Sequence, residues 1–180
     1  ADMLLMGLDT AERRGAHSLI ASRCSYFKPL ITPRGDRVVF TDWPTRTIYA
    51  VQWNGASLLT LGTGVAVTVW RDPATDREWV GLLDAIDDDG NGRPLRRVWL
   101  DYPSVREVVW DATPVTVDTI QASRDGRYLG ALFPWPRAGI ADLQTREVRL
   151  LGRGCWPALA PDDSRLLWVF DGPHRNVVLH

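Results

Sequence analysis

Apolar and polar residues alternate with a period of two along much of the chain, for example at Val38 and Phe40 and at Ile48 and Ala50. Successive side chains of a β-strand point to opposite faces of the sheet, so this period is typical of strands. Prolines and glycines interrupt nearly every stretch within about ten residues, which leaves little room for helices. The pattern predicts an all-β protein of short strands.

A hairpin pattern is repeated four times along the sequence. Each copy is an apolar, alternating run that ends in a turn and is followed by a second short strand. Leu8, Trp53, Leu100 and Leu143 hold equivalent places in the four copies and are spaced by 45, 47 and 43 residues. A fixed period of roughly 40–50 residues is typical of repeat architectures such as β-propellers.

A second motif lies between the hairpins, where a polar turn leads into an apolar strand. It occurs as Thr32-Pro33-Arg34-Gly35-Asp36, Ser123-Arg124-Asp125-Gly126 and Ala160-Pro161-Asp162-Asp163-Ser164. Proline fixes φ early in such a turn, and glycine or aspartate tolerates the positive φ that follows. The motif resembles the SPDG turn in blades of the TolB-like, PD40 or WD40-like repeat family. The resemblance implies a β-propeller built of four-stranded antiparallel blades.

The repeats supply about four blades' worth of sequence in a single β-propeller segment, 1–180. We expect two half blades at the ends and three complete blades between them, at about 1–22, 23–62, 63–114, 115–153 and 154–180. Propellers typically have about four to eight blades. We therefore expect a part of a larger propeller, completed by the rest of a longer precursor or by another chain. A closed four-bladed ring is the alternative.

The charge balance excludes some classes of partner. The formal net charge is −1, from 21 basic and 22 acidic residues, so no field of one sign favours nucleic acid. No apolar run approaches the roughly 18 residues that a membrane span needs. The chain begins with Ala1 and not with Met, which suggests processing or excision from a longer precursor. The resemblance implies a periplasmic or extracellular protein of a bacterium.

The chain has two cysteines, Cys24 and Cys155, each just ahead of an aromatic-rich strand candidate. If they occupy equivalent strands of neighbouring blades, a disulfide would stabilise the fold by roughly 4–5 kcal/mol in the chain-entropy model. Such a bond would also indicate an oxidising compartment. The alternative is two separate buried thiols, because a free cysteine packs as a small hydrophobic residue.

Aromatic, imidazole and guanidinium groups gather in the loops of the last two repeats. The candidate ligand-binding residues are Trp135, Arg137, Trp156, His174 and Arg175. In a propeller the Trp135 and His174 loops join the same pair of strands in neighbouring blades, so we expect these groups at one rim. They suit a peptide or a sugar through stacking, hydrogen bonds and charge. The alternative is that the tryptophans pack between blades while prolines protect edge strands.

One acidic loop resembles the start of a calcium site. The segment 87–92 matches the first six positions of a calcium loop, with Asp87, Asp89 and Asn91 as the alternating oxygen ligands. The place of the bidentate glutamate is held by Val98, and no helix is expected beside the loop. A polar hairpin turn is therefore the alternative to calcium binding. No other cofactor is expected.

The sequence offers little for catalysis. Its three histidines, His17, His174 and His180, do not accompany a G-x-S-x-G or a cysteine-nucleophile motif. No catalytic residue is therefore assigned. The resemblance implies a non-catalytic binding or scaffold module for a protein or peptide partner. Two alternatives remain, the propeller part of a larger enzyme of the peptidase-gating or polysaccharide-lyase type, and a structural assembly subunit with open strand edges.

Overall fold

The computed structural model describes residues 3–10, 15–160, 162 and 164–180. The predicted turn at 160–164 is covered only in part, because Pro161 and Asp163 lie outside the described residues. The described residues form nineteen β-strands and one 3-10 turn, η1 (Val117–Thr119), and they contain no α-helix. The prediction of an all-β protein is confirmed.

Three antiparallel sheets have four strands each, and each sheet follows the order of the chain from its first strand to its fourth. The first sheet consists of β3 (Tyr26–Ile31), β4 (Arg37–Asp42), β5 (Thr47–Gln52) and β6 (Leu59–Thr63). The second consists of β7 (Val65–Arg71), β8 (Glu78–Leu83), β10 (Leu95–Trp99) and β11 (Tyr102–Trp110). The third consists of β13 (Gln121–Ala122), β14 (Tyr128–Leu132), β15 (Arg137–Asp142) and β16 (Glu147–Arg153).

Smaller sheets lie before, between and after these three. Near the N-terminus β1 (Met3–Gly7) pairs with β2 (His17–Cys24), and near the C-terminus β17 (Cys155–Leu159), β18 (Leu167–Phe170) and β19 (Val177–Leu179) form a three-stranded sheet. The short strands β9 (Asn91–Gly92) and β12 (Val115–Thr116) pair with each other. The β1–β2 and β17–β19 sheets are separate from one another.

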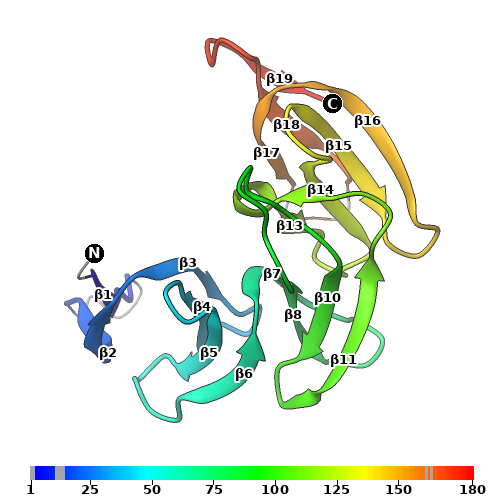
Figure 1. Cartoon of the computed structure of the whole chain (residues 1–180). Coiled ribbons are helices and arrows are strands. Elements are labelled where there is room, and N and C mark those ends of the chain that lie inside the picture. Colours follow the sequence, from blue (N-terminus) through cyan, green and yellow to red (C-terminus); the bar gives the residue numbers. More distant parts are fainter. Residues whose placement is uncertain (1–2, 11–14, 161, 163) are drawn as a thin grey trace.

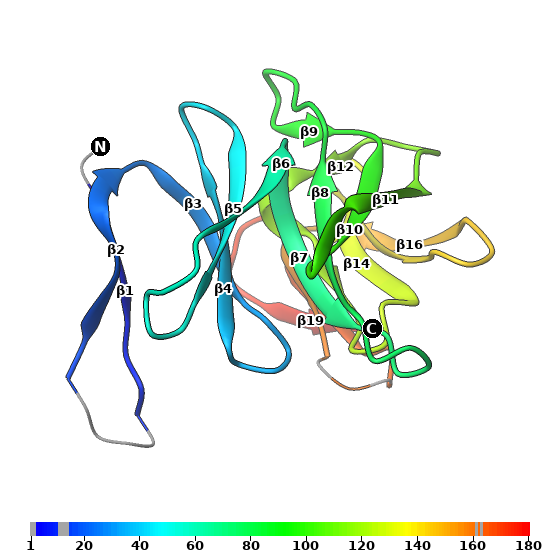
Figure 2. The ribbon, with the colours of Figure 1, turned by 90° about the horizontal axis from the view of Figure 1, so that it is seen from below.

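The sheets succeed one another as the blades of a β-propeller. Figure 1 shows them in sequence order, from β1–β2 in blue to β17–β19 in orange and red. Their first strands are neighbours, because β3 contacts β7, β7 contacts β13, and β13 contacts β17. In Figure 2, seen from below, the β1–β2 hairpin and β16 lie at opposite sides of the molecule. The predicted fold class, a β-propeller of four-stranded antiparallel blades, is confirmed.

The blades have two distinct ends. Because neighbouring strands run in opposite directions, the turn after each first strand and the loop after each second strand lie at opposite ends of the blade. We call the first the turn end and the second the entry end. At the turn end, the amide of Gly35 donates to the carbonyl of Thr32 at 2.8 Å, and the amide of Gly126 donates to Ser123 at 2.9 Å. Both glycines have a positive φ, as the turn motif requires.

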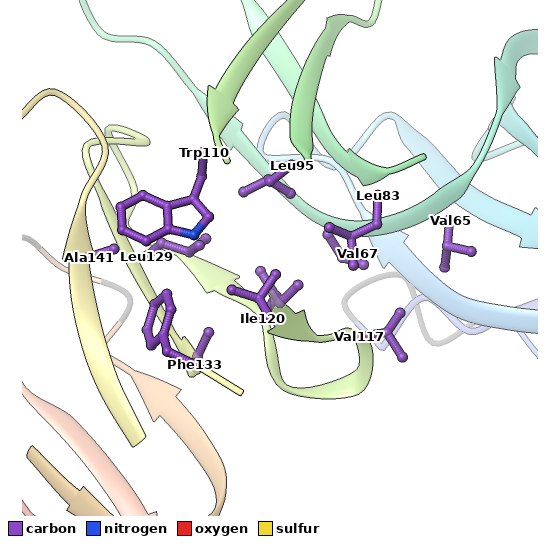
Figure 3. Packing of buried hydrophobic residues seen from close by; sticks show 12 residues of the cluster. Val65, Val67, Leu83, Leu95, Trp110, Val117, Ile120, Leu129, Phe133 and Ala141 are labelled. Carbon is purple, nitrogen blue, oxygen red and sulfur yellow. The ribbon is translucent and has the colours of Figure 1, made fainter. Parts of the chain in front are cut away.

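The largest apolar cluster lies mainly between the second and third blades. Figure 3 shows Trp110 and Leu95 of the second blade facing Leu129 and Phe133 of the third. The Trp110 and Phe133 rings meet edge to face, with 5.8 Å between their centroids. The indole nitrogen of Trp110 is satisfied by the carbonyl of Thr113 at 2.9 Å. This packing holds the third blade, which carries Trp135, against the second.

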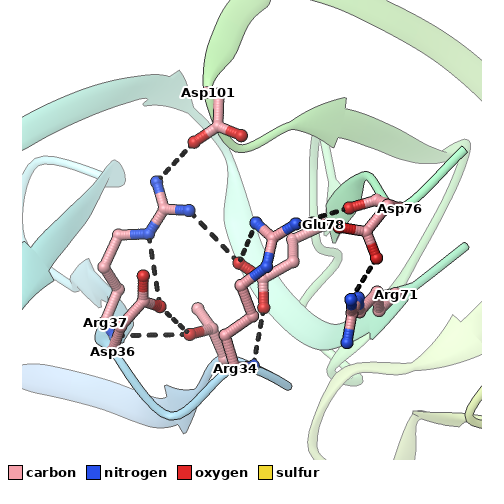
Figure 4. Close-up of polar contacts among 8 residues, drawn as sticks. Arg34, Asp36, Arg37, Arg71, Asp76, Glu78 and Asp101 are labelled. Carbon is pink, nitrogen blue, oxygen red and sulfur yellow. Dashed lines mark hydrogen bonds and ion pairs between the residues drawn. The ribbon is translucent and has the colours of Figure 1, made fainter.

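A network of charged side chains joins the first and second blades at the turn end (Figure 4). Glu78, at the start of β8, has a side chain only 1% exposed and accepts the amide of Arg34 at 2.8 Å and a guanidinium hydrogen of Arg37 at 3.2 Å. Arg37 also pairs with Asp101, and Arg34 pairs with Asp76, each at 2.7 Å. The buried carboxylate is therefore compensated by two arginines from the neighbouring blade.

Candidate functional site

Most of the candidate residues lie at the entry end of the blades. Trp135 belongs to the loop between β14 and β15, and His174 and Arg175 belong to the loop between β18 and β19. The acidic loop 87–92 follows β8, the second strand of its blade, so it lies at the entry end as well. Trp156 is near the start of β17, a first strand. The alternation of strand direction thus places a set of distant residues on one face.

A hydrogen-bond chain connects the acidic loop to the tryptophan loop. The Thr116 hydroxyl donates to Oδ1 of Asn91 at 2.8 Å, and the backbone amide of Trp135 donates to that hydroxyl oxygen at 3.1 Å. Thr116 lies on β12, between the second and third blades. The two loops that the sequence analysis treated as separate sites are therefore neighbours across a blade junction.

The aromatic candidates continue along the same face. The indole nitrogen of Trp135 approaches Sγ of Cys155 at 3.5 Å. Next to Cys155, the Trp156 ring lies over the His174 ring, with 4.7 Å between the centroids and 30° between the planes. Trp135 and Trp156 are 61% and 53% exposed. These two rings are therefore open to a partner and are not sealed between blades.

The two arginine candidates are exposed at the same face. The backbone amide of Arg175 donates to Oδ1 of Asp171 at 2.8 Å, and the Asn176 amide group donates to Oδ2 at 2.7 Å. The hydrogen bond from Asn176 is the main cause that lowers the pKa of Asp171, which therefore stays ionised in its turn. Within the described residues, neither Arg137 nor Arg175 has an ion pair, so both guanidinium groups face solvent.

A groove of about 550 Å³ runs along the first strands of four successive sheets. Its walls include Lys28 on β3, Thr68 on β7, Ala122 on β13, Trp156 on β17 and Trp168 on β18. The volume is in the range of small-molecule and peptide pockets, roughly 300–1,000 Å³. Trp156 belongs both to this groove and to the aromatic cluster, so the two features form one continuous surface.

Lys28 is a charged residue of the groove that sequence reasoning missed. Its ammonium group is half-buried and donates to the carbonyl of Ile120 at 3.1 Å. Burial lowers the pKa of Lys28 to about 8, and the nearby carboxylate of Asp118 opposes this effect without cancelling it. It is the only lysine of the chain, against twenty arginines, a bias that carried no chemical assignment in the sequence.

Lys28 and Trp156 occupy equivalent, irregular places in their strands. Lys28 has φ 45° and Trp156 has φ 48°, values that side chains other than glycine seldom adopt. Each lies where the pairing to the second strand shifts register, and each precedes a proline, Pro29 or Pro157. Such bulges redirect side chains and gather at functional sites. The shared residue-before-proline pattern is a sequence signal that could have identified Lys28.

The acidic loop forms a self-contained turn. Oδ1 of Asp87 accepts the amide of Asn91 at 2.8 Å, and the amide of Gly90 donates to the Asp87 carbonyl at 3.0 Å. Oδ1 of Asn91 is engaged by Thr116, and Asp89 is exposed. No group of three or more His, Cys, Asp or Glu side chains in the described part of the chain could hold a metal ion. Calcium binding at Asp87, Asp89 and Asn91 stays a prediction.

Cys24 and Cys155 are separate free thiols in this structure, which corresponds to the alternative to a disulfide, and both are half-buried. Cys24 ends β2 and donates to Oδ1 of Asp42, whereas Cys155 begins β17 and contacts Trp135. The hydrogen bond to Asp42 raises the pKa of the Cys24 thiol. The condition for a disulfide, equivalent strands in neighbouring blades, is not met in this structure, because three full blades separate β2 from β17 (Figure 1).

A second cavity, of about 670 Å³, lies away from these residues. It is lined mainly by β14, β15 and β16, with Arg165, which precedes β18, and His180, which follows β19. None of the candidate ligand-binding residues contributes to it.

No helix in the described residues has the length and apolarity of a membrane span.

Comparison with solved structures shows the propeller fold. An oligogalacturonate lyase from Vibrio parahaemolyticus aligns with 98% of this chain and 53% of its own length, at a TM-score of 0.68 and 11% identity. An oligogalacturonate lyase in complex with manganese aligns with 92% of this chain and 50% of its own, at a TM-score of 0.65 and 10% identity. At such identities the likeness concerns the fold alone. The chain spans about half the length of these lyases.

Other propeller structures are more distant. A structure from a study of two prolyl endopeptidases aligns with 86% of this chain and 26% of its own, at a TM-score of 0.53 and 20% identity. TolB from Acinetobacter baumannii aligns at a TM-score of 0.43, which is too low to support an argument. No protein-family model and no curated protein matches the sequence. Membership of the TolB-like or PD40 family therefore stays a prediction from the turn motif.

Proposed function

We propose that this chain is a non-catalytic β-propeller binding module whose protein or peptide partner lies along the groove and its aromatic rim. The observation that carries the proposal is the continuity between the groove and the exposed Trp156–His174 pair. A partner seated there would bury a tryptophan that is already held by a neighbouring ring. Tryptophan and arginine are enriched among residues that dominate binding energy at protein interfaces.

The chemistry of the surface suits a polypeptide. Exposed rings at the rim offer stacking and apolar contact, and the guanidinium groups of Arg137 and Arg175 are free to bind carbonyl or carboxylate oxygens. The groove also contains the hydroxyl of Thr68 and the side-chain amide of Gln121, whose oxygens accept the backbone amides of Ala122 and Leu159 and whose N–H and O–H groups can still donate to a partner. An extended peptide carries the alternating apolar and polar groups that such a surface can accept.

Peptide-display selection tests the proposal. A random peptide library is panned on the wild-type chain, and each enriched peptide is then measured by fluorescence anisotropy against the Trp156→Ala and Tyr102→Ala variants. Tyr102 is a comparable control because it is 59% exposed and lies at the turn end. Enriched peptides that lose affinity for Trp156→Ala alone support the proposal. No enrichment, or equal loss in both variants, would contradict it.

The propeller part of a larger enzyme is the alternative role, and an assembly subunit is a further one. The fold likeness to lyases and to prolyl endopeptidases is compatible with the enzymatic role, and nothing in the geometry decides for it. Formation of unsaturated uronate from oligogalacturonate, followed by ultraviolet absorbance, tests the lyase version. Product formation that is absent from a heat-unfolded control would overturn the non-catalytic proposal.

Completion by a second chain or by a longer precursor, in the periplasm or outside the cell, is part of the same proposal. Light scattering of the purified 20.2 kDa chain measures whether it associates with itself. An intact mass spectrum of the parent protein and cell fractionation address the precursor and the compartment. A stable monomer with no longer parent would favour a self-closed module.

A further inference from the structure

The ammonium group of Lys28 has fewer partners than it can bind. An ammonium group has three N–H donors, and the hydrogen bond that Lys28 makes within the described residues goes to the carbonyl of Ile120. Asp118 is the carboxylate that acts on it, and Arg124 is the other cation that lines the same groove. Two donors therefore remain for a group that enters the groove.

We propose that Lys28 is the anchoring point of the groove for a carboxylate of the bound peptide. This inference rests on the proposed function, because it names the group of the peptide that the groove recognises. The carboxylate accepts the two remaining ammonium hydrogens, and the adjacent side chain of the peptide contacts Trp156 and Trp168. The positive φ of Lys28 and the bulge around it direct the side chain into this position.

The surroundings favour a single carboxylate over a phosphate. Asp118 places a negative charge near Lys28, and a dianionic phosphate would be repelled by it more strongly than a monoanion. Phosphate sites are typically built from arginine forks or from several backbone amides, whereas this groove combines the Lys28 ammonium group with Arg124, the carboxylate of Asp118 and mainly apolar walls. A carboxylate attached to an apolar residue matches this combination.

Binding should be linked to proton uptake. Burial lowers the pKa of Lys28 to about 8, and a bound carboxylate would raise it again by favouring the charged amine. The charged groups that face Lys28 or line its groove are Asp118 and Arg124. The protonated fraction of the free amine falls about tenfold between pH 7 and pH 9, so affinity should fall by about the same factor.

The single lysine makes the test direct. Growth on lysine labelled with ¹³C at Cε marks Lys28 alone, because it is the single lysine of the sequence, and leaves its three N–H donors intact. The Lys28→Arg variant identifies the Lys28 signal by its loss. The probes are a pool of randomised N-acetyl tetrapeptides with a free terminal carboxylate, the same pool as carboxamides, and galacturonic acid. Each is added to the labelled chain at pH 7 and pH 9 while the ¹³C signal and the dissociation constant are followed.

Three results together support the inference. The carboxylate pool shifts the Lys28 signal and raises its pKa, the carboxamide pool does not, and affinity falls about tenfold from pH 7 to pH 9. In Lys28→Arg the guanidinium group stays charged, so binding should become independent of pH over this range. A merely structural Lys28 would not produce this difference in pH profile.

Other results overturn the inference and separate it from the proposed function. Equal shifts by carboxylates and carboxamides, or peptides that depend on Trp156 and leave the Lys28 signal unchanged, would refute the carboxylate anchor while the binding module stands. A shift by galacturonic acid alone would replace the peptide with a sugar acid and refute both. Failure of every probe, with no enrichment in the display selection, would also refute both.

Discussion

Glu78 and Lys28 are both charged side chains held between blades, and they differ in how well they are compensated. Glu78, at the turn end, accepts hydrogen bonds from two arginine residues of the neighbouring blade (Figure 4). Lys28, in the groove, donates to one backbone carbonyl and has Asp118 nearby. The compensated carboxylate of Glu78 joins two blades. The ammonium group of Lys28 has fewer partners and faces a groove in which a ligand can supply them.

Removing the charge of Glu78 should have the largest effect. Glu78→Gln leaves Arg34 and Arg37 without their buried carboxylate, and we expect a loss of about 3 kcal/mol in the free energy of unfolding. Urea unfolding followed by tryptophan fluorescence measures it. Glu147→Gln, on an exposed strand position, is the control and should change stability by less than about 0.5 kcal/mol. Similar losses in the two variants would show that the buried network around Glu78 is not what makes its charge stabilising.

Removing the charge of Lys28 should instead increase the free energy of unfolding at neutral pH. Its folded-state pKa is about 8, below the value of 10.5 for a free lysine. The lysine therefore binds its proton less tightly in the folded chain than in the unfolded chain, and protonation favours unfolding. Below pH 8 this costs stability, and the cost disappears as the pH rises towards 10.5. Lys28→Met should therefore stabilise the chain at pH 7, by about 2 kcal/mol, and have little effect at pH 10.5.

Urea unfolding of wild type and Lys28→Met at the two pH values measures this difference. Lys28→Arg is the matched variant, since its charge persists across the range and it should give no such gain at pH 7. A Lys28→Met variant that is destabilised equally at both pH values would show that Lys28 is structural.

Trp156→Ala should separate binding from stability. The ring is 53% exposed, so we expect the free energy of unfolding to change by less than about 1 kcal/mol, while the affinity for a selected peptide falls about tenfold. Unfolding and fluorescence anisotropy on the same preparation measure both. If stability falls by several kcal/mol and affinity does not change, the tryptophan belongs to the blade and not to the site.

The acidic loop should give the smallest effect. Asp89 is exposed, and Asp87 and Asn91 are engaged in the turn, so Asp89→Asn should shift the melting temperature by no more than about 1 °C, with or without added calcium. Differential scanning fluorimetry with calcium and with a chelator measures it. A calcium-dependent rise in the wild type that Asp89→Asn abolishes would establish the cation site.

Local signals in the sequence were sufficient for the architecture. The period of two predicts strands, and the turns at Gly35 and Gly126 require the positive φ that the structure shows. The sequence placed Trp156 and His174 in one candidate cluster of the last two repeats, and their rings do meet. These predictions depend on residues close in sequence or on the repeat itself.

Long-range contacts could not be predicted in the same way. Lys28 and Ile120 are 92 positions apart, so their contact and the burial that lowers the pKa of Lys28 become visible only when the blades are assembled. The partner of the Cys24 thiol is Asp42 on a neighbouring strand pair, which cysteine spacing alone cannot reveal. The same holds for Thr116, which joins the acidic loop to Trp135.

The pKa of Lys28 in the ligand-free chain is the most direct test of the groove as a binding site. A ¹³C NMR titration of the labelled Cε of Lys28, with Lys28→Arg for assignment, measures it. We predict a value of about 8, caused by burial that Asp118 does not offset. A value near 10.5, that of a free lysine, would show a solvated side chain. It would contradict the proposal that the groove holds a partly buried ammonium group whose remaining partners come from the ligand.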